Sequence, residues 1–94
     1  MPIIIRTEDH SERIATLCDD EMMLPALIPA LEDWLRENRG KLKPGSYVAD
    51  VGFSAREDAT GGGPVLSPAM LRTMSDLGMW LYLSEYNSSD EETA

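Results

Sequence analysis

Cysteine and histidine, two residue types common in catalysis, each occur once in this 94-residue chain. The sequence contains one cysteine, Cys18, and one histidine, His10, which together could form a thiol nucleophile and its base. Cys18 falls on the apolar stripe of a helix predicted for residues 11–22, where a cysteine is typically a small buried hydrophobic side chain. His10 is typical of a solvated turn. We therefore predict no catalytic residue and expect that the chain is not an enzyme.

Two acidic segments, "EDH" at residues 8–10 and "CDDE" at residues 18–21, bring together atoms of the kind that bind metals. A structural zinc site usually pairs cysteines and histidines at short spacing, and a calcium loop alternates acids around a glycine. Neither pattern occurs in these segments. Both are typical of solvated chain, and we predict neither a metal ion nor another cofactor.

The segment "GGGPVLSP" at residues 61–68 combines a glycine run with the start of a helix, as phosphate-binding loops do. It has no lysine, and it matches neither GxGxxG nor GxxxxGK[ST]. Pro64 and Pro68 also lack the backbone N–H groups that would hold a phosphate. The glycines therefore indicate a mobile connector, and the helix start is indicated by Ser67 as N-cap with Pro68 in the first helical position.

Asp50 is the carboxylate best placed for chemistry, because it lies within the alternating segment "SYVADVGFSA" at residues 46–55. This alternation predicts a half-buried strand with Asp50 on the face opposite Tyr47, Val51 and Phe53. Together with the loop 57–66, Asp50 could form a small-ligand or enzymatic site. The competing interpretation is an ordinary polar residue on the wet face of a sheet.

Net charge limits the partners of the chain. Seventeen acids against eight bases give −9, and without Asp90, Glu91 and Glu92 the remaining 14 acids and 8 bases give −6. Such a charge repels phosphate backbones and anionic lipids, so we predict no nucleic-acid and no membrane partner. A basic protein is the partner that this charge attracts.

The cellular compartment is predicted from features that the sequence lacks. A single cysteine excludes an internal disulfide, and no apolar run approaches the about 20 residues of a membrane-spanning helix. The segment "MPIIIRTEDH" does not have the pattern of a signal peptide. We predict a cytoplasmic location.

Apolar periodicity predicts an α+β or small α/β fold, with a three-stranded sheet and two or three helices on one of its faces. The predicted elements are a strand at 2–7, a helix at 11–22, a helix starting near Pro29 and capped by Gly40, a strand at 46–55, a helix from Pro68 to its cap Gly78, and a strand at 79–86. The strand–helix–strand order at the end predicts parallel neighbouring strands. We expect a single globular domain at residues 1–86 and a disordered acidic tail at residues 87–94.

The last strand, "MWLYLSEY", has one aliphatic and one aromatic face. If the helices cover the aliphatic face, then Trp80, Tyr82 and Tyr86 lie exposed, as is typical of an interface. The alternative is that residues 8–22 fold back over the aromatic face. We predict a partner-binding site formed by Asp50, Trp80, Tyr82 and Tyr86.

The stretches "GPVLSPAML", "DLG" and "LYLSEY", preceded by "YVADVGF" and "ALEDWL", resemble a bacterial family of small α/β domains. Members of that family combine an LSP-x-x-L helix start, an LG helix end and a final strand ending in Tyr. The resemblance implies the fold, and by analogy it implies an immunity-like protein. The family's final strand often carries acids where this chain has Tyr82 and Ser84, so no role of those acids is carried over.

The preferred hypothesis is a non-enzymatic protein-binding module, immunity-like or inhibitory, that neutralises a basic protein. The alternatives are a structural homodimer, in which the last strand or its aromatic face pairs with itself, and the small-ligand or enzymatic domain built on Asp50.

Overall fold

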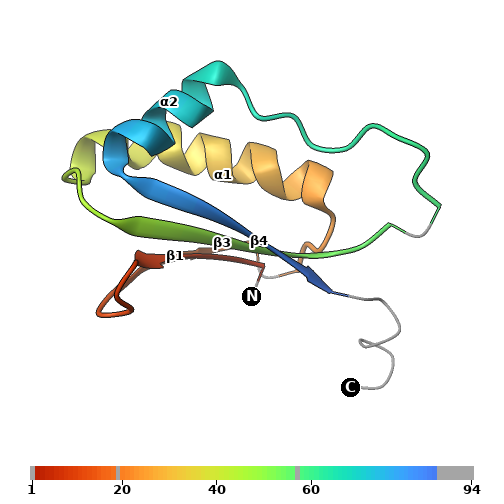
Figure 1. Ribbon diagram of the computed structural model, residues 1–94, viewed down its shortest axis with the longest axis horizontal. Helices are drawn as coiled ribbons and strands as arrows, with labels where there is room; N and C mark the ends of the chain where they lie inside the picture. Colours follow the sequence, from red (N-terminus) through yellow and green to blue (C-terminus); the bar gives the residue numbers. More distant parts are fainter. Residues whose placement is uncertain (1, 19, 57, 87–94) are drawn as a thin grey trace.

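A computed structural model of the chain describes residues 2–18, 20–56 and 58–86. Within these residues the fold is a four-stranded mixed sheet with two α-helices on one side (Figure 1). The elements in chain order are β1 (Ile3–Thr7), β2 (Arg13–Leu17), α1 (Leu24–Asn38), the 3₁₀ turn η1 (Arg39–Lys41), β3 (Tyr47–Ser54), α2 (Pro68–Leu77) and β4 (Met79–Tyr86). The predicted α+β class is confirmed, whereas the predicted number of strands is wrong. The predicted tail 87–94 lies outside the described residues.

The additional strand is β2, which occupies the segment predicted as a helix at residues 11–22. It pairs antiparallel with β1 across a hydrogen-bonded turn, in which Thr7 N–H donates to Glu12 O at 2.9 Å. Within the predicted helix, Cys18 has a φ angle of 60°, a left-handed value that a right-handed helix excludes. The helix prediction failed because the hairpin supplies both the backbone partners and the apolar contacts of this segment.

Helix α1 begins at Leu24 rather than near Pro29. Pro25 lies in the first turn, where no N–H is needed, but Pro29 lies inside the helix. Pro29 is exposed, so the carbonyl left without a helical partner lies on the solvent side. The helix is retained because its opposite face buries Leu27, Ile28, Leu31 and Leu35, and each buried leucine or isoleucine contributes about 1.5–3 kcal/mol.

The helix ends confirm one sequence prediction and correct another. At α2, Ser67 accepts a hydrogen bond from Met70 N–H at 3.0 Å, and Gly78 ends the helix with φ 74°, as predicted. Gly40 does not cap α1. The cap is Arg39 in right-handed geometry, and the chain tightens there into η1.

The sheet has the order β2-β1-β3-β4. Strand β1 runs antiparallel to both neighbours, whereas β3 and β4 are parallel and joined through α2, as the sequence predicts. The helix-facing side of the sheet is the core, and its buried residues include Ile3, Ile5, Ala49, Val51 and Met79.

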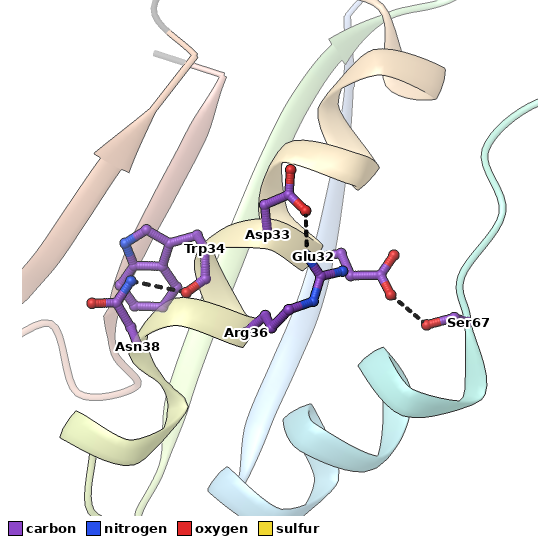
Figure 2. Close-up of polar contacts among 6 residues, drawn as sticks. All are labelled: Glu32, Asp33, Trp34, Arg36, Asn38 and Ser67. Atoms are coloured by element: carbon purple, nitrogen blue, oxygen red, sulfur yellow. Dashed lines mark hydrogen bonds and ion pairs between the residues drawn. The ribbon is translucent and has the colours of Figure 1, made fainter.

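A polar contact joins the two helices. The Ser67 hydroxyl donates to Glu32 Oε2 at 2.6 Å, so the N-cap of α2 is also bound to the middle of α1 (Figure 2). On the same helix, Arg36 donates to Asp33 at 2.9 Å, and Asn38 donates to the Trp34 carbonyl at 2.8 Å. With the helices held on one side of the sheet, the other side remains open.

Candidate functional site

The candidate site lies on the side of the sheet that the helices do not cover, which we call the open face. Strand alternation and cross-strand register place ten residues of three strands on it. They are Ile4 and Arg6 from β1, Val48, Asp50, Gly52 and Ser54 from β3, and Trp80, Tyr82, Ser84 and Tyr86 from β4.

The four residues predicted as a binding site all lie on the open face. Asp50 is the direct neighbour of Tyr82, while Trp80 lies beside Val48 and Tyr86 beside Ser54. The Trp80, Tyr82 and Tyr86 residues are 58%, 40% and 50% exposed. The alternative in which residues 8–22 cover these aromatics is wrong, because β2 lies at the sheet edge opposite β4.

Asp50 is held in place by a residue that the sequence reasoning missed. The Ser84 hydroxyl donates to Asp50 Oδ1 at 2.7 Å, which joins β3 to β4 through side chains. Asp50 is half-buried. Because one carboxylate oxygen is engaged by Ser84, the orientation of the group toward solvent is restricted. The signal for Ser84 was its position on the same face of the last strand as Tyr82.

Arg6 is a second residue that the sequence reasoning missed. Its guanidinium lies 5.7 Å from the centroid of the Tyr82 ring, and its Nη1 donates to the carbonyls of Thr7 and Glu8 at 3.1 and 3.2 Å. A cation–π contact at an exposed position contributes about 0.5–1 kcal/mol. Val48 is fully buried although no helix covers it, and its cross-strand neighbours are Arg6 and Trp80.

Tyr86 lies at the far end of the open face, over a glycine. A Cβ on Gly52 would approach the Tyr86 ring to 3.0 Å, tighter than ordinary packing. The absence of a side chain at Gly52 therefore leaves space for the Tyr86 ring beside β3. Tyr86 is separated along β4 from the cluster of Asp50, Tyr82 and Arg6, so the predicted site is extended rather than compact.

Beside Asp50 the open face has a hollow of about 400 Å³. It is lined by Ile4, Arg6, His10, Glu12, Arg13 and Asp50. None of the described residues 58–66 lines it, so the predicted combination of Asp50 with the loop 57–66 is not brought together there. Arg6 and Arg13 are cross-strand neighbours, and within the described chain neither lies at salt-bridge distance from a carboxylate.

The residues considered for catalysis and metal binding are spread apart. His10 precedes β2 and Cys18 follows it, so the two lie at opposite ends of that strand and do not form a nucleophile–base pair. In the ranges 2–18, 20–56 and 58–86, no three His, Cys, Asp or Glu residues gather closely enough to hold a metal ion.

The turn at the tip of the β1–β2 hairpin carries a perturbed carboxylate. Hydrogen bonds from the Ser11 hydroxyl, the Ser11 N–H and the Thr7 hydroxyl lower the pKa of Asp9 to about 2. Thr7 Oγ1 donates to Asp9 Oδ1, and Ser11 N–H donates to the same oxygen, each at 2.9 Å. The donors are Ser11 in the turn and Thr7 at the end of β1, so this carboxylate shapes the hairpin that borders the hollow.

Comparison with family models, with curated proteins and with solved structures gave no match for this chain. The resemblance to the bacterial α/β family therefore stays a prediction. None of the described helices is long and apolar enough to cross a membrane.

Proposed function

We propose that the chain is a non-enzymatic protein-binding module whose open face binds a basic protein, in the manner of an immunity-like or inhibitory neutraliser. The observation that carries the proposal is the exposure of Trp80, Tyr82 and Tyr86 on one uncovered side of the sheet. Aromatic residues dominate binding energy at protein interfaces, because they bury large areas with little loss of side-chain freedom.

Charge supports the choice of a basic partner. The chain carries −9, which accelerates encounters with positively charged proteins and disfavours acidic ones. Asp50 adds a carboxylate within the open face itself, oriented by Ser84. A lysine or arginine of the partner that reaches Asp50 would meet a carboxylate, with the exposed aromatic residues of β4 on the same face.

The experiment is affinity purification of the tagged chain from its native host, followed by binding measurements with any stoichiometric partner. The double variant Trp80→Ala/Tyr82→Ala should weaken binding by about a hundredfold, since aromatic hot spots are commonly worth about 2 kcal/mol or more. Leu71→Ala is the matched control, because Leu71 is 49% exposed on α2, away from the open face. Binding by the double variant at wild-type strength would exclude the open face as the site.

The hollow beside Asp50 favours a second candidate function, the binding of a small anion. This candidate is supported by Arg6 and Arg13, which are neighbours across β1 and β2 and line the hollow. His10 also lines it. Calorimetric titration with inorganic phosphate and with a dicarboxylate tests this candidate. Binding should be lost in Arg13→Ala and kept in Arg72→Ala, which removes an exposed arginine from α2. No heat of binding from either anion would remove the candidate.

A further inference from the structure

We propose that the outer edge of β4 pairs antiparallel with β4 of a second copy of the chain, which joins the two sheets into one. This inference goes beyond the proposed function, because the pairing uses the backbone edge of β4 and does not need a heterologous partner. The sheet order puts β4 at one edge and β2 at the other.

The two edges differ in how well they are protected against pairing. Strand β2 has five residues, begins with Arg13, and has an irregular register with β1. Charges, short length and irregular pairing are the usual means by which an edge avoids other strands. Strand β4 has eight residues without proline, and Glu85 is its one charged residue. It therefore presents a long and regular edge.

The backbone of β4 is oriented for such pairing. Gly78 O and Tyr86 O accept hydrogen bonds from Tyr47 N–H and Ala55 N–H on the β3 side. Because backbone groups alternate along a strand, the even-numbered residues of β4 face β3 and the odd-numbered residues face outward. The outward N–H and C=O groups belong to Met79, Leu81, Leu83 and Glu85.

A twofold axis perpendicular to the sheet relates two antiparallel copies of β4, and the residue on which it is centred sets their register. It keeps both open faces on the same side, so residues of one face must lie opposite residues of that same face. Centring the axis on Leu83 places the two copies of Leu83 opposite each other and Leu81 opposite Glu85. On the open face, Trp80 of one copy then lies opposite Tyr86 of the other.

This register accounts for apolar residues that the monomer leaves exposed. Leu83 is on the helix side of the sheet, yet 53% of it is exposed and it is not part of the core. The pairing covers Leu83 with its own copy and sets Trp80 beside Tyr86, and aromatic cross-strand pairs are favourable in antiparallel sheets. One register thus gives partners to the three most exposed apolar residues of β4.

Shape and charge favour a second copy as the occupant. A hollow of about 450 Å³ lies at the beginning of β4, lined by Ser46, Ser75, Met79, Trp80 and Leu81 among others. Antiparallel pairing brings the end of the second β4, with Tyr86, to this hollow. It also brings Glu85 toward the end of the sheet that follows Lys41 and Lys43.

The test is the mass of the full chain in solution, measured by sedimentation from about 1 µM to about 100 µM. Salt is kept near 0.15 M, where the Debye length of about 8 Å limits repulsion between two chains of charge −9. We expect a concentration-dependent dimer. Leu83→Lys should raise its dissociation constant by about tenfold or more, because two ammonium groups would meet at the axis. Circular dichroism should show an unchanged fold, since Leu83 is not part of the core.

Leu71→Lys is the matched control, because Leu71 is 49% exposed, close to the 53% of Leu83, but lies on α2. It should leave the dimer intact. Leu83→Cys should form a disulfide between the two substituted positions on mild oxidation, which peptide mass spectrometry distinguishes from a bond through Cys18. Val65→Cys, at an exposed loop position, should not form such a disulfide. A monomer throughout the range, or a dimer insensitive to Leu83→Lys, would overturn the proposal.

Discussion

Gly78 lies directly against the backbone carbonyl of Gly45, so closely that there is no room for a Cβ on Gly78. Gly78 combines this contact with a left-handed φ of 74°. Gly45 N–H donates to Leu77 O, and Tyr47 N–H donates to Gly78 O, each at 3.0 Å. The loop before β3 therefore holds the point at which α2 turns into β4, and the position of the aromatic strand depends on this contact.

Gly78→Ala should lower the free energy of unfolding by about 3 kcal/mol or more, since left-handed strain and a backbone clash add to each other. Gly40→Ala is the control, because nothing lies within 4 Å of a Cβ there and Gly40 is not at positive φ. It should change stability by less than about 1 kcal/mol. Urea unfolding of the variants measures both. Equal stability of the two variants would contradict the proposed role of the contact.

Ser67→Ala should destabilise the chain by about 1–2 kcal/mol, because it removes both the N-cap of α2 and the hydrogen bond to Glu32. A double-mutant cycle with Glu32→Ala separates the two effects. We expect a coupling free energy of about 0.5–1.5 kcal/mol for the Ser67–Glu32 pair. Ser75→Ala, on the exposed side of the same helix, should be nearly neutral. Strict additivity of the Ser67 and Glu32 substitutions would show that the contact between the helices contributes nothing.

Local signals in the sequence predicted the second half of the fold well. Ser67, Pro68 and Gly78 predicted both ends of α2, and strict alternation predicted β3 and β4. The hairpin strand β2 was missed because Ile14, Leu17 and Cys18 also match helical spacing, and only the pairing with β1 decides between the two.

The candidate site was predicted in part for a similar reason. Alternation along each strand predicts which face of β3 carries Asp50 and which face of β4 carries the aromatic residues. The parallel register of the two strands then makes Asp50 and Tyr82 neighbours. The contributions of Arg6 and Ser84 could not be predicted. They depend on which strand lies beside which and at what register, and no local pattern contains that information.

Asp9 should make the stability of the chain depend on pH in the acidic range. Its pKa is lowered from 3.8 to about 2, so the carboxylate stabilises the hairpin fully above about pH 4 and loses this effect as pH falls toward 2. Thermal midpoints of the wild type and Asp9→Ala should differ near neutral pH and converge near pH 2. Asp33→Ala, on exposed helix surface, serves as the control carboxylate. A difference that is constant from pH 7 to pH 2 would contradict this role.

Arg6 should stabilise the open face through its hydrocarbon stem more than through its charge. The stem lies beside Val48, which is fully buried without a helix above it, and the charge lies over the exposed ring of Tyr82. Arg6→Met, which keeps a long apolar side chain, should cost about 0.5–1 kcal/mol, the size of an exposed cation–π contact. Arg6→Ala also uncovers Val48 and should cost about 1 kcal/mol more.

Urea unfolding of both variants in the wild-type and Tyr82→Leu backgrounds separates the contribution of the stem from that of the charge. In the Tyr82→Leu background the effect of Arg6→Met on stability should nearly vanish, while the difference between Arg6→Ala and Arg6→Met persists. If both variants instead lose the same free energy of unfolding, the charge of Arg6, and not its stem, protects this face.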